Sequence, residues 1–245
     1  MASLTFVPII VAASHHLSST QCSQIDEIRV CTNRTCRRQG SMQILETLTG
    51  LAPPNVSVNR SGCLGRCGAG PNLALLPDGV TIGHCGTAAR AAEIMAGFCY
   101  GDGGADAAMK SLDALSLRKR AEGKILNGDF SDAELLLCQA TELNPVGGLH
   151  IIYKDRSIVR LAMGNHSGAL DDARQALALA HQYTEAYICE GDALLAMYQF
   201  DAAEKSYSTC LQIDPSIGRS KPFKARMAKL QEKLTAVNSP GNYPM

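Results

Sequence analysis

The chain has 245 residues, of which 46% are hydrophobic, and it carries 23 acidic and 23 basic side chains. This length predicts one or two domains, and the hydrophobic content suffices for ordinary cores. No apolar run approaches the roughly 18 residues of a membrane-spanning helix, and the zero net charge argues against a general role in nucleic-acid binding. The charge is nevertheless uneven: residues 78–215 carry eleven basic and nineteen acidic side chains, whereas the regions on either side are basic.

The first 25 residues contain no Asp or Glu and are rich in Ser and Thr. A Ser-rich, acid-free opening that begins Met-Ala-Ser resembles a chloroplast transit peptide, and the lack of arginine weakens a mitochondrial interpretation. We therefore expect a transit peptide or a disordered leader over residues 1–25. The corresponding location is the chloroplast or, alternatively, the cytosol.

Residues 26–99 have the pattern of a compact α+β domain. Short β-rich runs alternate with one amphipathic segment, and Pro77-Asp78-Gly79 is a turn signal between two apolar runs. The expected order is strand, helix, strand, hairpin and helix, at residues 27–31, 42–48, 56–58, 73–83 and 87–98.

Four cysteines in this region form two close pairs, spaced C-x4-C and C-x3-C: Cys31, Cys36, Cys63 and Cys67. Glycine or arginine adjoins Cys36, Cys63 and Cys67, rather than the apolar neighbours on both sides that a buried structural thiol would have. Two such pairs separated by a strand–helix unit are what a thiolate-ligated metal centre needs. Zinc knuckles usually space their cysteines by two residues, so the wider gaps favour a 2Fe-2S cluster. A zinc site, a redox dithiol pair and four unrelated thiols are the alternatives.

The surrounding charge supports an anionic cluster. Between Ile28 and Pro77 the chain supplies six arginines against Glu46 alone, an excess of five positive charges. Such an excess would stabilise a net-negative 2Fe-2S cluster held by four thiolates. Glycines around the second pair would let the backbone approach the cluster closely.

The cysteine order and the phrase GCLGRCGAGPN resemble those of the thioredoxin-like 2Fe-2S ferredoxins and of the related small iron-sulfur subunit of respiratory complex I. The resemblance covers residues 27–99. It implies a thioredoxin-like fold, with Cys31, Cys36, Cys63 and Cys67 as ligands of a 2Fe-2S cluster that transfers single electrons. It also makes Pro71 a candidate cis proline.

A Gly- and Asp-rich segment at residues 100–105 indicates a boundary, and we expect a linker over residues 100–113. Beyond it the aligned alanines Ala133, Ala169 and Ala203 are 36 and 34 residues apart, and small residues recur at Ala140, Ala176 and Cys210. This pattern resembles tetratricopeptide repeats (TPRs). Three units with a capping helix are expected over residues 114–236, followed by a disordered tail at 237–245. The expected fold class is an α+β thioredoxin-like N-terminal domain followed by an all-α TPR solenoid.

A TPR array predicts a concave groove that binds a protein partner. The positions that match the carboxylate-binding residues of TPR co-chaperones are occupied by Arg118, Glu122, Asp155, Glu185 and Cys189. Only Arg118 keeps the required character, and the three acidic residues would repel a carboxylate. A chaperone C-terminal tail is therefore disfavoured as a partner, and a basic or neutral segment is favoured, although solvated helix faces also carry such charges.

No nucleophile triad, phosphate-binding loop or His–carboxylate pair is found, so we expect an adaptor or electron carrier rather than an enzyme. The leading hypothesis is a 2Fe-2S adaptor that docks through its TPRs, for one-electron transfer with a redox partner, for redox sensing, or for assembly within a larger complex. One alternative is a TPR scaffold or assembly factor whose metal site is structural (zinc) or lost. Another is a subunit that delivers electrons to a flavoprotein.

Overall fold

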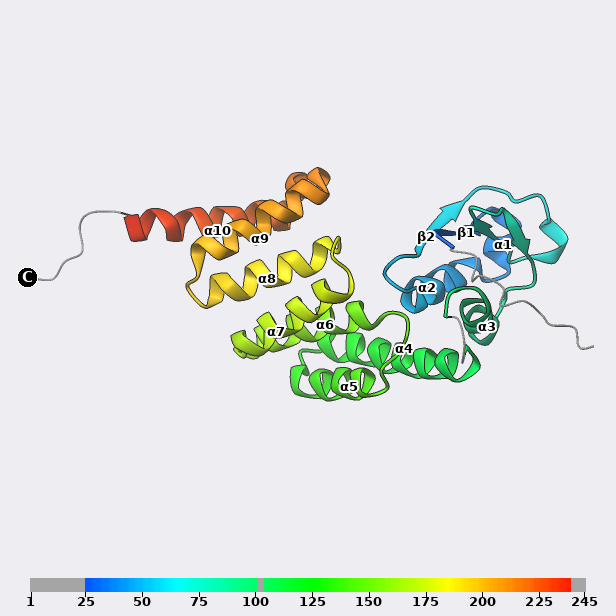
Figure 1. Cartoon of the computed structure of the whole chain (residues 1–245), viewed down its shortest axis with the longest axis horizontal. Helices are drawn as coiled ribbons and strands as arrows, with labels where there is room; N and C mark the ends of the chain where they lie inside the picture. The colour runs from blue at the N-terminus through cyan, green and yellow to red at the C-terminus, as the bar shows by residue number, and fades with distance from the viewer. Residues whose placement is uncertain (1–24, 101–103, 239–245) are drawn as a thin grey trace, which may run out of the picture.

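The computed structural model describes residues 25–100 and 104–238. Figure 1 shows a small head that contains the strands, followed by a helical array that ends in α10 (Lys221–Asn238). Except for Ile25, the expected leader lies outside the described residues, and so does the expected tail from residue 239 on. The chloroplast or cytosolic location therefore stays a prediction.

The head contains a four-stranded sheet in the order β2-β1-β3-β4. Its strands are β1 (Glu27–Cys31), β2 (Ser57–Ser61), β3 (Leu73–Leu76) and β4 (Val80–Ile82). Strands β1 and β2 pair in parallel, whereas β1–β3 and β3–β4 are antiparallel. Gly79 has a φ of 72° in the turn between β3 and β4, as the Pro-Asp-Gly signal of the predicted hairpin requires.

Helices α1 (Arg34–Arg38), α2 (Ser41–Leu51) and α3 (Ala88–Phe98) complete the head. Apolar side chains from the sheet, α2 and α3 form one buried core that includes Ile28, Val30, Ile44, Leu48, Leu73, Leu75, Ile94 and Met95. Figure 1 shows α2 and α3 between the sheet and the helical array. The head therefore meets the array through its helical face.

Before α10, six helices of the array form three antiparallel pairs. They are α4 (Gly104–Leu126), α5 (Phe130–Glu142), α6 (Leu149–Ala162), α7 (His166–Leu179), α8 (Thr184–Ala196) and α9 (Phe200–Ile213). All the small residues that the repeat pattern singled out are fully buried: Ala133, Ala140, Ala169, Ala176, Ala203 and Cys210. They let paired helices approach closely, which supports the predicted TPRs.

The turn within each helix pair contains one residue with a left-handed backbone. These residues are Gly128 and Gly164, each with a φ of 82°, and Tyr198, with a φ of 61°. Their spacing reproduces the period of the aligned alanines. In the described parts of the chain, no helix is long and apolar enough to cross a membrane.

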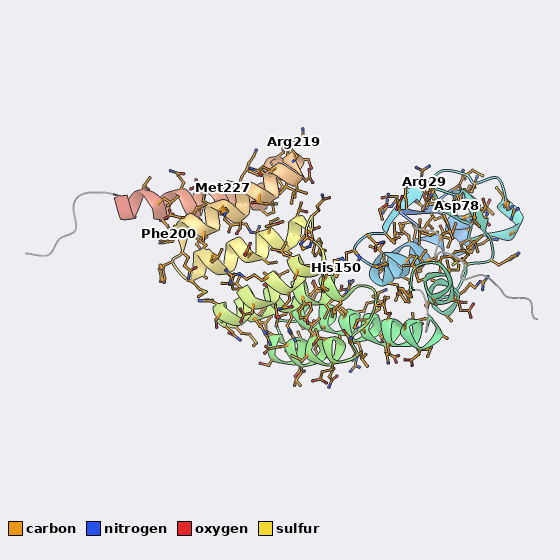
Figure 2. The ribbon with its side chains drawn as sticks, in the orientation of Figure 1. Arg29, Asp78, His150, Phe200, Arg219 and Met227 are labelled. Atoms are coloured by element: carbon orange, nitrogen blue, oxygen red, sulfur yellow. The ribbon has the colours of Figure 1, made fainter. Side chains whose placement is uncertain are left out.

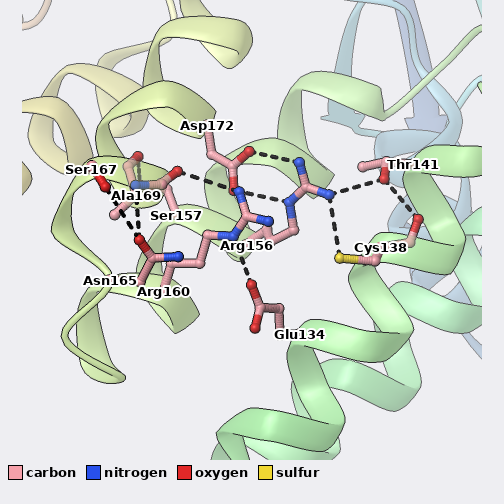
Figure 3. Close-up of polar contacts among 11 residues, drawn as sticks. Glu134, Cys138, Thr141, Arg156, Ser157, Arg160, Asn165, Ser167, Ala169 and Asp172 are labelled. Carbon is pink, nitrogen blue, oxygen red and sulfur yellow. Dashed lines mark hydrogen bonds and ion pairs between the residues drawn. The ribbon is translucent and has the colours of Figure 1, made fainter.

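A buried polar network ties α5, α6 and α7 together (Figure 3). Arg156 on α6 donates to both carboxylate oxygens of Asp172 on α7, at 2.9 and 2.7 Å. Arg160 pairs with the same carboxylate at 3.0 Å and with Glu134 on α5 at 2.7 Å. Because the Asp172 side chain is only 3% exposed, its charge is stabilised by these two guanidinium groups rather than by water.

Helix α4 belongs to two cores. Ala108 and Leu115 are buried in the core of the head, whereas Ala114 and Ala121 are buried among the side chains of α5 and α6. The expected linker over 100–113 is thus corrected, because α4 begins at Gly104 and its first turns pack on the head.

The turn between α5 and α6 contacts the end of α2 backbone to backbone. The Gly148 N–H donates to the Ala52 carbonyl at 3.2 Å, and the Tyr100 hydroxyl donates to the Leu51 carbonyl at 2.7 Å. A β-carbon at Gly147 would lie 1.7 Å from the Leu51 carbonyl oxygen, so no larger residue fits there without a shift of the backbone. A salt bridge of 2.8 Å between Lys119 and Glu46 adds a further contact.

The predicted fold class requires correction. Helices make up most of the described chain, and its strands form one small sheet near the N-terminal end. A thioredoxin-like α+β domain is not supported as the class of this protein. The cysteine-rich stretch covers only part of the head, whereas the repeated helical pattern extends over most of the described chain.

We expect Leu115→Ala to lower the free energy of unfolding by about 2–4 kcal/mol, because it removes a buried side chain from the junction of α4 and the head. Urea denaturation followed by circular dichroism measures this change. Leu126→Ala is the matched control, since Leu126 lies on the same helix and is 87% exposed. Equal effects of the two substitutions would contradict the shared packing of α4.

Asp172→Ala should destabilise the protein by about 3 kcal/mol, because it leaves two arginines without their shared carboxylate. The adjacent Asp171→Ala should change stability by less than about 0.5 kcal/mol, since Asp171 is exposed. Thermal and urea unfolding of both variants provide the comparison. A similar, small effect of both substitutions would show that the network contributes little to the fold.

Candidate peptide-binding groove

The four cysteines of the predicted metal centre lie at one end of the sheet. Cys31 ends β1 and Cys36 lies on α1, and both are buried, whereas Cys63 and Cys67 are exposed on the loop after β2. The sulfur atoms of Cys63 and Cys67 are 3.4 Å apart. Burial raises the pKa of Cys36, and the Gly65 N–H lowers the pKa of Cys63 by donating to its sulfur. The bond between Gly70 and Pro71 is cis, as the sequence suggested.

A pocket lies where the head meets the concave face of the repeats. Its volume is about 350 Å³. The head supplies one wall, from Thr49, Ala52, Pro53, Pro54, Val56 and Val58, and the repeats supply the other, from Arg118, His150, Ile151, Tyr183 and Glu185. Figure 2 shows His150 at the end of α6 that faces the head.

A second pocket of about 470 Å³ continues the first one. The two share Pro54, His150 and Tyr183, and the second adds Asn55 and residues of the turn between α7 and α8, including Gln182. We call the two pockets together, with the adjoining residues Glu122, Lys154 and Asp155, the groove. It is long enough to involve three repeat helices and the head at once.

Acidic side chains outnumber basic ones in the groove. Arg118 pairs with Glu122 at 3.0 Å and lies 3.7 Å from Asp155, and Lys154 also pairs with Asp155. Glu185 is exposed, and within residues 25–100 and 104–238 it forms no salt bridge with a basic side chain. Both cations are therefore already neutralised, and one carboxylate is not.

Three buried polar atoms in or beside the groove have no hydrogen-bond partner: Nε of Arg118, Nδ1 of His150 and Oδ2 of Asp155. The His150 ring packs edge-on against Tyr183, with the ring centroids 5.1 Å apart. Burial lowers the pKa of His150 to about 4, and the positive charge of Arg118 acts in the same direction. At neutral pH this imidazole is uncharged and can exchange hydrogen bonds with a ligand.

The sequence placed five residues in the groove. Four of them line the groove or adjoin it. Arg118 pairs with both Glu122 and Asp155, and Glu185 lies on the wall, but Cys189 is buried, which raises its pKa to about 12. The wall that the head supplies over residues 49–58, and the place of His150 in the groove, were not predicted from the sequence. No local sequence signal marks them, because the packing of α4 on the head creates this wall.

Comparison with known proteins connects the chain with TPR proteins. A scan against protein-family models finds no match. The protein named STIP1 homolog of Dictyostelium discoideum is 33% identical over 103 residues, which is 42% of this chain and 18% of that protein. Small glutamine-rich tetratricopeptide repeat-containing protein 2 of Mycosarcoma maydis is 28% identical over 111 residues, 45% of this chain and 30% of that protein. The chain thus spans less than a third of the length of these curated relatives.

Among solved structures, the Sgt2 TPR domain from Aspergillus fumigatus shares 22% identity, covers 54% of this chain and 85% of that one, and has a TM-score of 0.49. The first TPR of Spaghetti (RPAP3), solved with the HSP90 peptide SRMEEVD, shares 21% identity and covers 51% of this chain and 94% of that one, with a TM-score of 0.46. Neither score reaches 0.5.

These findings correct the predicted cofactor and family. The relatives are TPR proteins rather than thioredoxin-like 2Fe-2S ferredoxins. In the described part of the chain, no group of three or more His, Cys, Asp or Glu side chains is placed to hold a metal ion. The 2Fe-2S cluster and the ferredoxin-type electron transfer predicted from Cys31, Cys36, Cys63 and Cys67 are therefore wrong, whereas the repeats and their role in protein–protein interaction are supported.

Acid should destabilise the protein partly through His150. Its pKa is lower in the folded state than the ordinary value of 6.5, so its contribution is complete above pH 6.5 and is lost as the pH falls towards 4. His150→Gln should remove about 2 kcal/mol of the stability difference between pH 7 and pH 4.5. Urea denaturation at both pH values measures it.

His181→Gln is the control, because His181 belongs to the same groove but is exposed. The variant should keep the pH dependence of the native chain. An unchanged slope in His150→Gln would show that the buried imidazole does not limit acid stability.

Proposed function

We propose that this protein is a TPR adaptor that binds an extended or helical segment of a partner protein in the groove. The observation that carries this proposal is the cluster of buried polar atoms without hydrogen bonds, on Arg118, His150 and Asp155, beside open pockets. Nε of Arg118 and Oδ2 of Asp155 lie 3.7 Å apart as an ion pair without a hydrogen bond, whereas Nδ1 of His150 has no polar partner among the described residues. A buried polar atom costs about 1–3 kcal/mol when it stays unpaired. A bound segment with its own backbone and side-chain polar groups could supply the missing partners.

The shape of the groove suits a chain segment. Apolar residues of the head and Ile151 form its sides, while charged groups lie along the repeat helices. Two adjoining pockets of about 350 and 470 Å³ can accept successive side chains of one segment. The similarity to TPR proteins supports the same function.

A chaperone C-terminal peptide is the second candidate partner. Solved TPR domains are described as bound to the HSP90 peptide SRMEEVD and to the HSP70 peptide SGPTIEEVD. These complexes conflict in part with the prediction that such tails are disfavoured. The charges of this chain still argue against an acidic tail, because Glu122, Asp155 and Glu185 surround the one matching arginine.

Selection of a phage-displayed library of random 12-residue peptides on the full chain tests the adaptor proposal. We expect enriched peptides that cross-link to a photoreactive residue at position 182 in the groove. The same residue placed at position 199 is the control, since Gln182 and Gln199 are both exposed but only Gln182 belongs to the groove. Absence of peptides that cross-link selectively at position 182 would refute the proposal.

Fluorescence anisotropy with labelled SRMEEVD separates the two partner classes. We expect it to bind at least about tenfold more weakly than the selected peptides, because of like-charge repulsion. Micromolar binding of SRMEEVD that cross-links at position 182 would instead favour the chaperone tail.

A further inference from the structure

One carboxylate of the groove forms no salt bridge with a basic side chain of the described residues. Lys154 and Arg118 are its cations, and each already lies beside a carboxylate of the repeats. Glu185 is exposed at the first turn of α8, where its Oε2 accepts a 3.0 Å hydrogen bond from the Thr184 hydroxyl. A cation that enters the groove would therefore find a carboxylate available.

An anion that enters the groove would find both cations already paired with carboxylates. To pair with Arg118 it would have to displace Glu122 or Asp155 and then remain close to both. Displaced carboxylates in a partly buried site repel the newcomer and lose their own partner. The charge of the groove thus selects against acidic ligands and for basic ones.

The walls fit a long aliphatic stem. Pro53, Pro54, Val56 and Val58 of the head and Ile151 of α6 line the same pocket as Glu185. Lysine and arginine bury their methylene groups along apolar surface and keep their charged end beside a carboxylate or water. A shorter cation such as protonated histidine could not use both features.

We propose that the groove recognises a lysine or arginine side chain in the bound segment, with its stem against the proline- and valine-lined wall of the head and its cation beside Glu185. This inference rests on the proposed adaptor function and names the chemistry of the partner: a basic segment. It also assigns the head a direct role in partner selection, because the apolar wall belongs to residues 52–58.

The peptides that cross-link at position 182 provide the test. We expect a lysine or arginine at one fixed position, and replacement of that residue by norleucine should weaken binding about fivefold or more. Glu185→Gln should weaken the binding of the selected peptide by a similar factor and leave the binding of its norleucine variant unchanged. Glu185→Lys should weaken the binding of the selected peptide further. The same variant should bind a peptide whose basic residue is changed to glutamate.

Glu204→Gln and Glu204→Lys are the matched controls, since Glu204 is exposed on α9, outside the groove, and the substitutions change the net charge equally. They should change the affinity less than twofold. Groove-bound peptides without a required basic residue, or peptides selected for acidic residues, would overturn this inference while leaving the adaptor function intact. Absence of any peptide specific to position 182 would instead refute the adaptor function itself.

Discussion

The structure depends on helix α4, which is buried on two of its faces. One face completes the core of the head through Ala108 and Leu115, and another starts the repeat array through Ala114 and Ala121. Since both faces belong to one continuous hydrogen-bonded helix, neither can reorient without the other. This coupling holds the head against the concave face of the repeats and so creates a groove with walls from both units.

The charged side chains of the groove bear on which ligand it can bind. TPR-type helix pairs present polar side chains on their concave face, and here those side chains form internal ion pairs around Arg118, with Glu185 left over. Partly buried charges interact more strongly than exposed ones because solvent screens them less. These charges are the basis of the proposal that the groove binds a basic segment.

The repeats were predictable from the sequence because their signal is local and recurs. Small residues such as Ala133 and Ala169 return at nearly constant spacing, and each is buried where the pattern places it. The groove was only half predictable, since the repeat alignment reaches Glu185 but contains nothing about the opposite wall. The cofactor prediction rested on the spacing of cysteines along the chain, whereas the described residues contain no group of three or more candidate ligands placed to hold a metal ion, and the relatives are TPR proteins. The prediction of a linker was wrong because the glycines up to Gly104 indicated a domain boundary, whereas α4 begins at Gly104.

The double burial of α4 has a consequence for how the protein can be divided. A fragment that starts at residue 114, the expected start of the repeats, would leave out Ala108 and would present Leu115 to water without the head that covers it. A fragment that stops at residue 99 would lose the same two side chains from its own core. Exon shuffling or proteolytic trimming at this point would damage both products, so the two halves are expected to be inherited and degraded as one unit.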